Sequence, residues 1–265
     1  MLKIKQKNSL NILCKNLYIK IPKNFINLIM NNILLWGGKS RALIIHNYLE
    51  NINSLNKKFL EKKLKKEINI KYIFDKFIKK INFKSKAEFS NKTSNLKKYI
   101  KHSNYFIVCI GNNHGMARFL ISKKLEKYGL KPINIVSKYS IIDHSSIIGK
   151  GNQIEHSATI QCYSKIGDYC IINTNSTVEH ECIIGNGVHI MGGASIAGKV
   201  KIGNFVNIGT NSTILPGLTI EDGAFIGAGA IVTKNVKKNQ IVFGNPAKFI
   251  KKFKHKYSLQ EFINI

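Results

Sequence analysis

The chain has 265 residues, 44% apolar residues and a formal net charge of +28. This length and apolar content predict one or two globular domains and exclude wholesale disorder, and no run reaches the roughly eighteen uncharged apolar residues of a membrane span. The five cysteines are scattered without CxxC or Cys/His spacing. That pattern argues against a disulfide framework or a zinc site, so we expect a cytoplasmic protein with no metal and no membrane insertion.

The positive charge is concentrated in the first half of the chain. Residues 1–138 contain 30 of the 42 Lys and Arg residues and 6 of the 14 Asp and Glu residues. Such a surface attracts nucleic acid, anionic lipid or a phosphorylated small molecule. The charge is almost all lysine, without the Arg-rich or aromatic-interleaved clusters typical of nucleic-acid binding. Lys, Asn and Ile are abundant together, as in proteins of AT-rich genomes, and we therefore expect no nucleic-acid partner.

Residues 1–30 form an N-terminal extension that we do not assign. After it, strands and helices alternate, which predicts a small Rossmann-like parallel α/β domain over residues 31–135. Between them, Leu55, Phe59, Leu60, Leu64 and Ile68 keep helical spacing, so an insertion at 51–70 is expected to contain an amphipathic helix, whereas 76–100 has no assigned element. The expected elements are the strand Asn32–Trp36, a helix over Arg41–Glu50, the strand Lys71–Phe74, the strand Tyr105–Ile110, a helix over Met116–Tyr128 and a fourth strand at Asn134–Val136.

A strict repeat of six residues dominates the second half of the chain. Every sixth residue from Ile142 to Val232 is Ile or Val, a period that neither a helix nor an ordinary strand explains. One large and one small inward residue per hexad predicts a parallel β-helix of about five triangular coils, eighteen residues each, over residues 136–250. Glycine often follows the Ile, where we expect a tight corner. A tail of residues 251–265 follows, with a possible helix at Phe253–Phe262. The small residues, four positions after the Ile, are Ser146, Ala158, Ser164, Cys170, Ser176, Cys182, Ala194, Ser212, Ala224 and Ala230.

Two histidines and two carboxylates lie within the single segment 173–189. Acyl transfer from a thioester needs a base for the incoming nucleophile, and neutral imidazole suits that role near pH 7. In this segment His180 is followed directly by Glu181, which can orient the imidazole. A backbone N–H aimed at the thioester oxygen is also required, and Gly198 lies eighteen residues after His180, one coil further along. The alternative is a solvated corner for His180 and a packing role for His189.

The segment NTNSTVEHECIIGNGVHIMGGASIAGKVKIG resembles the motif of the left-handed β-helix sugar acyltransferases. It is most similar to the bacterial N-acetyltransferases of nucleotide-linked 4-amino-dideoxy sugars and to the related sialic-acid O-acetyltransferases. The resemblance spans about Asn32–Lys251, and the left-handed sense of the prism rests on it. It implies a homotrimer with its active sites between the prisms, acetyl-CoA as co-substrate, and a nucleotide-linked amino sugar as acceptor.

The resemblance also assigns roles to individual residues. His180 is implied to be the general base and Glu181 its partner. Residues implied to bind the sugar or its nucleotide are Asn173, His189, Gly37, Gly38, Lys39, Arg41, Asp75, Gly111, Asn112 and Asn113. Residues implied to bind acetyl-CoA along the prism edge are His189, Gly198, Ala228, Gly244, Pro246 and Lys248.

The chain departs from the family pattern in its nucleotide-binding half. Asp75-Lys76 stands where two acidic residues are common, and WGGKSR replaces a GxxGHG-like turn. We expect Lys39 or Arg41 to compensate by pairing with the diphosphate.

Two other functions stay open, namely O-acetylation of a sugar hydroxyl, as in the sialic-acid enzymes, and a non-catalytic binding role. No nucleophile stands beside His180, because Cys182 falls in the small inward position, so direct transfer from acetyl-CoA is expected.

Overall fold

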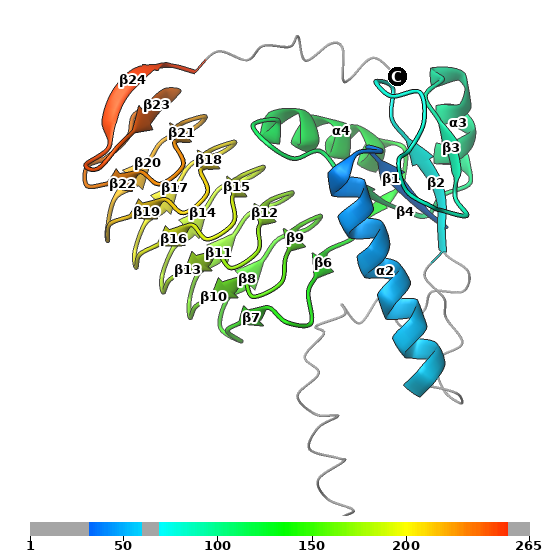
Figure 1. Cartoon of the computed structure of the whole chain (residues 1–265), viewed down its shortest axis with the longest axis horizontal. Coiled ribbons are helices and arrows are strands. Elements are labelled where there is room, and N and C mark those ends of the chain that lie inside the picture. The colour runs from blue at the N-terminus through cyan, green and yellow to red at the C-terminus, as the bar shows by residue number, and fades with distance from the viewer. Residues whose placement is uncertain (1–31, 60–68, 254–265) are drawn as a thin grey trace, which may run out of the picture.

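The computed structural model describes residues 32–59 and 69–253 (Figure 1). The expectations for residues 1–30, for 60–68 of the insertion and for the tail from 254 onward lie outside the described residues. The described chain forms an α/β domain followed by a prism of short strands. None of its helices is long and apolar enough to cross a membrane.

The α/β domain is built on a parallel sheet of five strands in the order β3-β2-β1-β4-β5. Its strands are β1 (Asn32–Trp36), β2 (Asn69–Phe74), β3 (Glu88–Ser90), β4 (Tyr105–Val108) and β5 (Lys131–Pro132). Its helices are α2 (Ser40–Phe59), α3 (Thr93–Lys101) and α4 (Gly115–Lys127). The predicted Rossmann-like arrangement is therefore confirmed, with the first three predicted strands at β1, β2 and β4.

Both faces of this sheet are buried, as in other parallel sheets flanked by helices. Alternate residues of β1 point to opposite sides. Ile33 and Leu35 pack with the apolar side chains of α2, whereas Leu34 and Trp36 pack with those of α3 and α4. The apolar residues of β1 thus belong to the hydrophobic cores on both faces of the sheet.

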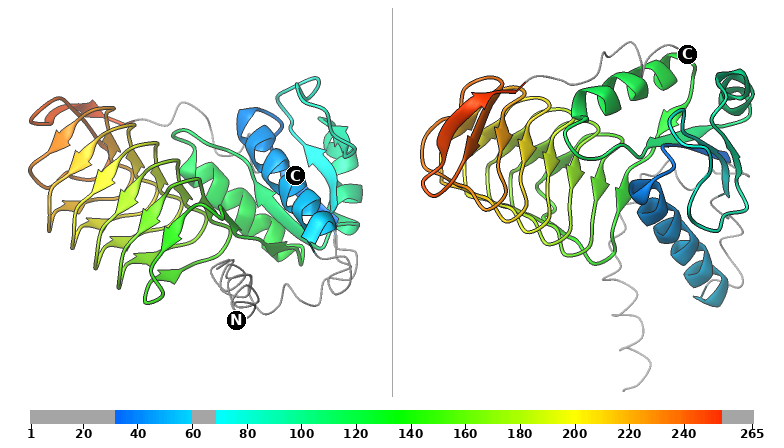
Figure 2. Two further views of the ribbon diagram at one scale, coloured as in Figure 1. Left: turned by 60° about the horizontal axis from the view of Figure 1, so that its bottom comes forward. Right: turned by 45° about the horizontal axis from the view of Figure 1, so that its top comes forward.

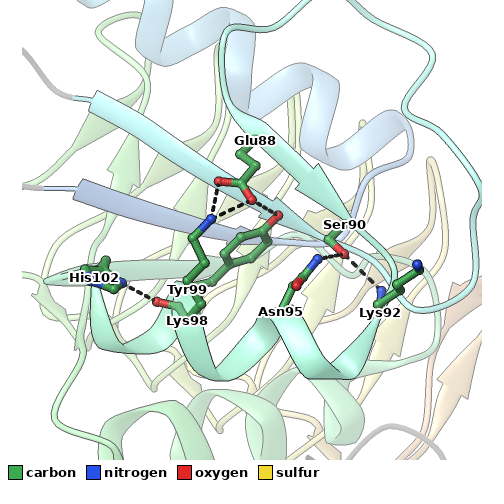
Figure 3. A network of polar contacts seen from close by, with 7 residues as sticks. All are labelled: Glu88, Ser90, Lys92, Asn95, Lys98, Tyr99 and His102. Carbon is green, nitrogen blue, oxygen red and sulfur yellow. Dashed lines mark hydrogen bonds and ion pairs between the residues drawn. The ribbon is translucent and has the colours of Figure 1, made fainter.

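Part of the α/β domain consists of elements that the sequence did not indicate. The strand β3 and the helix α3 occupy residues 88–101 and are joined by polar contacts (Figure 3). Glu88 accepts hydrogen bonds from Lys98 at 3.0 Å and Tyr99 at 3.2 Å, and Ser90 Oγ accepts one from Asn95 at 3.0 Å. A strand of three residues is too short to carry a readable period, which is why the sequence did not indicate it.

The predicted fourth strand belongs to a different sheet. Lys131–Pro132 pairs with β4 instead, while β6 (Ile135–Val136) pairs with β9 and begins the prism. The reason is the repeat itself, because Val136 stands six residues before Ile142 and so continues its register. The expected helix at Arg41–Glu50 is also longer, since α2 runs from Ser40 to Phe59.

The prism has three faces, which we call sheets I, II and III. Sheet I consists of β6 (Ile135–Val136), β9 (Gln153–Ile154), β12 (Ile171–Ile172), β15 (His189–Ile190), β18 (Asn207–Ile208), β21 (Phe225–Ile226), β23 (Gln240–Phe243) and the antiparallel β24 (Lys248–Lys252). Sheet II consists of β7 (Ile141–Ile142), β10 (Thr159–Ile160), β13 (Thr177–Val178), β16 (Ser195–Ile196), β19 (Thr213–Ile214) and β22 (Ile231–Val232). Sheet III consists of β8 (Ile147–Ile148), β11 (Lys165–Ile166), β14 (Ile183–Ile184), β17 (Lys201–Ile202) and β20 (Thr219–Ile220).

The pairing of these strands confirms the predicted period of eighteen residues per coil. Ile160 pairs with Val178 and Ile166 with Ile184, each eighteen residues apart. From Ile154 onward the repeated Ile and Val residues are buried inside the prism, and all the small residues predicted to point inward are buried with them. The fold is the expected left-handed parallel β-helix.

The corners differ in detail from the expectation for glycine. The left-handed backbone occurs three residues after the repeated Ile, often at non-glycine residues such as Tyr169 (φ 58°) and Glu181 (φ 58°). The glycines that directly follow the Ile do not have positive φ. They are needed for close approach between coils, since a Cβ on Gly149 would lie 2.6 Å from the carbonyl oxygen of Gly167.

The α/β domain docks on the prism through α4 (Figure 2). We call the corner at which the chain passes from sheet III to sheet I corner III–I, and Gly187 lies there. A Cβ on Gly115, the first residue of α4, would be 2.1 Å from the carbonyl oxygen of Gly187. Phe119 packs edge-on against Tyr169 and Phe205, with ring centroids 5.7 and 5.6 Å away. Helix and corner are therefore in direct contact.

Candidate active site

The His180–Glu181 pair lies at the corner between sheets II and III, corner II–III, just after β13. The Nδ1 atom of His180 is 3.0 Å from Oε2 of Glu181. Both side chains are about half exposed, 47% and 49%, so the imidazole is accessible. Lys199, from the next coil of the same corner, places its Nζ 3.8 Å from the same carboxylate oxygen. The carboxylate can thus hold Nδ1 protonated and leave Nε2 free to accept a proton.

Gly198 lies directly against the imidazole. A Cβ built on Gly198 would lie 2.4 Å from Nε2 of His180, so only glycine leaves the ring in its place. In residues 32–59 and 69–253, the Gly198 N–H has no hydrogen-bond acceptor. The expected juxtaposition of His180 and Gly198, one coil apart on one edge, is therefore present.

Cys182 is the nearest thiol in sequence to His180. It points into the prism, fully buried, and its Sγ lies 3.1 Å from the carbonyl oxygen of Ala197. Burial raises the pKa of this thiol. A buried thiol of raised pKa is a poor nucleophile, in agreement with the inert role expected for Cys182.

His189 lies on sheet I, in contact with the α/β domain. Its side chain is almost fully buried, and Nδ1 lies 3.1 Å from the carbonyl oxygen of Asn112. Its Nε2 is also buried and has no partner among the described residues. Burial, with the nearby Arg118 cation, lowers the pKa of His189 to about 3. His189 is therefore a neutral, buried imidazole beneath the Gly111–Asn113 loop.

Asn173 lies at the third corner, corner I–II, where the chain leaves β12 of sheet I for β13 of sheet II. Its Oδ1 accepts a hydrogen bond from the N–H of Thr174 at 2.9 Å. Asn173 and His180 thus belong to one coil but occupy different corners. The clustering of polar residues in the sequence does not correspond to one cluster on the surface of a single chain.

The residues expected to bind acetyl-CoA are separated in the same way. Gly198 lies at corner II–III, whereas Ala228 follows β21 at corner I–II. Gly244, Pro246 and Lys248 are exposed at the β23–β24 turn, next to the end of sheet I. The expectation of one continuous edge is wrong for a single chain, because Ala228 is thirty residues after Gly198 and one edge recurs every eighteen.

The glycine turn after β1 packs tightly on the ends of the neighbouring strands. Gly37 has φ 115°, and a Cβ there would lie 2.7 Å from the carbonyl oxygen of Cys109. The N–H of Gly38 donates to Oδ2 of Asp75 at 2.8 Å, and Oδ1 of Asp75 accepts from the N–H of Phe77 at 2.9 Å. Asp75 therefore lies beside the glycine turn, and it orders that turn as well as its own.

Lys39 and Arg41 follow this turn and point to different environments. Lys39 is exposed. Arg41 instead reaches the prism, where its Nη1 lies 3.1 Å from Oε1 of Glu155 and its Nε donates to Oε1 of Gln153 at 2.8 Å. The side chains of this ion pair are only 10% and 8% exposed. The expectation that Arg41 pairs with a diphosphate does not fit this arrangement, because its guanidinium is already bound to the prism.

The sequence also did not indicate Arg118. This residue of α4 is fully buried and donates hydrogen bonds to the carbonyl oxygens of Tyr169, Ile110 and Gly187, at 2.7, 2.7 and 2.9 Å. Burial lowers its pKa to about 10. One signal was available, since Arg41 and Arg118 are the only arginines among 42 basic residues. Arginine is the residue whose rigid fork of donors suits buried, multiply bonded positions.

In the part of the chain that the structure describes, no group of His, Cys, Asp and Glu residues has the arrangement of a metal site. The four cysteines within it are free thiols.

A family model, bacterial transferase hexapeptide (six repeats), matches residues 199–234. No curated protein sequence matches the chain significantly. Several solved structures are similar over most of the chain. PerB from Caulobacter crescentus, in complex with CoA and GDP-perosamine, is 21% identical, with a TM-score of 0.70 over 84% of this chain and 99% of that one.

The acetyltransferase domain of PglB from Neisseria gonorrhoeae is 23% identical, with a TM-score of 0.69 over 83% of this chain and 100% of that one. WeeI from Acinetobacter baumannii is 24% identical, with a TM-score of 0.67 over 82% of this chain and 99% of that one. These similarities extend across both parts of the described chain. The chain therefore has the fold of the left-handed β-helix, hexapeptide-repeat transferases that have an α/β N-terminal domain.

Proposed function

We propose that this protein is an acetyl-CoA-dependent N-acetyltransferase acting on the amino group of a nucleotide-linked 4-amino-4,6-dideoxy sugar, in the synthesis of surface-glycan precursors. The observation that carries the proposal is the accessible His180–Glu181 pair placed against Gly198. Its support from known proteins is that PerB shares the fold and was solved with CoA and GDP-perosamine.

In the proposed reaction His180 is the general base. Glu181 accepts a hydrogen bond from the Nδ1–H, so Nε2 can accept a proton from the C4 amine as the nitrogen attacks the thioester carbonyl. A C–N bond forms and the C–S bond then breaks. The imidazolium of His180 returns its proton to the departing thiolate of CoA, so the products are the acetamide and free thiol. No acyl-enzyme is involved, because Cys182 is buried and its pKa is raised.

Gly198 is the proposed oxyanion donor. Negative charge develops on the thioester oxygen as the amine attacks, and an oriented backbone N–H stabilises it. The Gly198 N–H has no acceptor within the described residues, and it lies on the coil adjoining His180. The base can therefore take the proton of the amine while the donor binds the oxygen of the carbonyl group that the amine attacks.

The separation of the two corners supports a site shared between subunits of a homotrimer. His180 and Gly198 lie at corner II–III, whereas Asn173 and Ala228 lie at corner I–II of the same chain. When prisms pack side by side, corner II–III of one subunit can face corner I–II of the next. Acetyl-CoA would then bind between them, with Gly244, Pro246 and Lys248 at its far end.

The α/β domain is the proposed binding site for the nucleotide. Its glycine turn, the Asp75 carboxylate and the Gly111–Asn113 loop lie at the carboxyl ends of β1, β2 and β4, where ligands of open parallel sheets bind. Lys39, which is exposed just after the glycine turn, is the proposed partner of the diphosphate. His189, beneath Asn112, is the proposed link between this domain and the prism. A free sugar acceptor would need no such domain, which favours N-acetylation over O-acetylation of sialic acid.

The test is product analysis by mass spectrometry with acetyl-CoA and a panel of UDP-, dTDP- and GDP-linked amino sugars. A mass gain of one acetyl group, with matching release of free thiol, is expected for at least one acceptor. His180→Ala should lower kcat by about a hundredfold or more. His144→Ala, an exposed histidine of the same corner two coils earlier, is the matched control and should leave the rate unchanged. No product with any acceptor, or an unchanged rate for His180→Ala, would refute the proposal.

A further inference from the structure

Arg41 connects the glycine turn of the α/β domain to the prism. It lies in the first turn of α2, which begins two residues after Gly38. Its guanidinium forms the ion pair with Glu155 and donates to Gln153, as described above. Its Nη2 is buried without a partner among the described residues. The side chain therefore directs its bonded donors to the prism and presents none of them to solvent.

The contacts of Arg41 form a closed ring. Gln153 accepts from Arg41 and donates through Nε2 to the carbonyl oxygen of Val108, at 2.9 Å. Val108 ends β4, and the next residue, Cys109, packs on Gly37 of the glycine turn. The turn is thus held at both ends against the same strand, β9 of the prism.

Glu155, the prism residue of the ion pair, lies near the proposed acceptor site. Glu155 lies at corner I–II, one coil before Asn173, and its N–H donates to the carbonyl oxygen of Ile172 at 2.9 Å. The ion pair therefore links the glycine turn, through Arg41, to the corner at which Asn173 lies. Both partners are buried, so the pair is not weakened by solvent as a surface pair would be.

We infer that Arg41 is a positioning residue for the acceptor: through Glu155 and Gln153 it holds the nucleotide-binding turn at a set distance from corner I–II, and it does not bind the diphosphate. The inference rests on the proposed function. A nucleotide held by the α/β domain places its sugar on the prism only if the domain and the prism keep their relative positions. Misplacement of reacting groups by about 1 Å can lower a rate roughly a hundredfold.

The test compares kcat with nucleotide affinity in Arg41→Met, Glu155→Gln and the double variant. Each single variant should lower kcat at least about tenfold, while Kd for UDP, dTDP or GDP, whichever the wild type binds best, stays within about twofold by calorimetry. Because the two residues form one pair, the double variant should lose little more than either single one. Lys39→Met is the contrasting variant, expected to weaken nucleoside diphosphate binding because its ammonium is exposed beside the turn.

Hydrogen exchange gives a readout besides activity. Glu155→Gln changes only the prism, yet it should accelerate amide exchange in residues 37–41 of the α/β domain. A Kd raised more than tenfold with unchanged kcat in Arg41→Met would overturn the inference and make Arg41 a phosphate ligand. Unchanged kcat and exchange in the isosteric Glu155→Gln would also overturn it, even if Arg41→Met does not fold. If the wild type acetylates no acceptor, the proposed function fails, while the exchange and binding results still decide whether Arg41 couples the two parts.

Discussion

Corner III–I and corner II–III follow the same six-residue repeat, but they differ in what their residues contact. At corner III–I the N–H groups of Lys150, Asp168, Asn186 and Asn204 each donate to an Asp or Asn side chain of the following coil, at 3.0, 2.8, 2.9 and 2.6 Å. The helix α4 then covers this ladder. At corner II–III the equivalent positions hold His144, Cys162, His180 and Gly198, with no such ladder.

The difference separates two tasks of a repetitive fold. One corner pairs its backbone donors with side chains and docks a domain, so its residues are dictated by packing. The other corner is left open, and its residues need only turn the chain. Reactive side chains can stand there without cost to the prism, and His180 does. Substitutions at the covered corner should therefore change stability, whereas substitutions of His180, Glu181 or Gly198 at the open corner should change activity.

The largest expected effect on stability is that of Arg118→Met at the covered corner. It removes the donors to several buried carbonyl groups, each of which then lacks a partner. We expect the free energy of unfolding to fall by at least about 3 kcal/mol, measured by urea denaturation. Lys127→Met, exposed on the same helix, is the control and should change it by less than about 0.5 kcal/mol. Equal stabilities for the two variants would contradict a docking role for the covered corner.

Gly198→Ala tests the open corner without touching an ionisable group. The new Cβ would lie 2.4 Å from Nε2 of His180, so the imidazole must move. We expect kcat to fall by up to about a hundredfold with little change in melting temperature. His144→Ala, an exposed residue at the equivalent position of the same corner three coils earlier, is the control and should leave kcat unchanged. A similar kcat for both variants would mean that the position of His180 is unimportant.

His189 adds a pH dependence to the buried junction. Its pKa is lowered from 6.5 to about 3, mainly by burial, so the unfolded chain takes up the proton first as the pH falls. Stability is then full above about pH 6.5 and declines below it, by at most about 1.4 kcal/mol per pH unit. Between about pH 7.5 and about pH 5.5 the free energy of unfolding should fall by roughly 1.4 kcal/mol. This loss should be absent in His189→Gln and retained in the exposed control His144→Gln. Identical pH profiles for the wild type and His189→Gln would show that His189 is not buried neutral.

The smallest expected effect on catalysis is that of Cys182→Ala. Its thiol is buried within the prism although its neighbour Glu181 is at the open corner. The variant should lose about 1 kcal/mol of stability and keep its kcat. Rapid-quench mass spectrometry of the wild type should detect no acetylated cysteine. A folded variant without activity would instead indicate a covalent intermediate.

Several features of the candidate site were predictable from the sequence. A period of eighteen placed His180 and Gly198 on one edge, and the structure has them in contact. The same arithmetic separates Ala228 from that edge, and applying it to the expected acetyl-CoA residues would have predicted two corners. Buried Cys182 also followed from the repeat, because the small position in each hexad points inward. The position of each residue along the prism is set by sequence spacing alone.

The sequence by itself determined the prism, its register and the residues at each corner, because a repeat of six imposes the same local geometry on every coil. Only the tertiary structure decided what covers each corner. The contact between Arg41 and Gln153 joins residues 112 positions apart, and the contacts of Arg118 with the prism span 51 to 70 positions. No local period encodes such pairs, because they depend on how two separately patterned parts meet. The contacts of the two buried arginines at that junction could therefore not be predicted from the sequence.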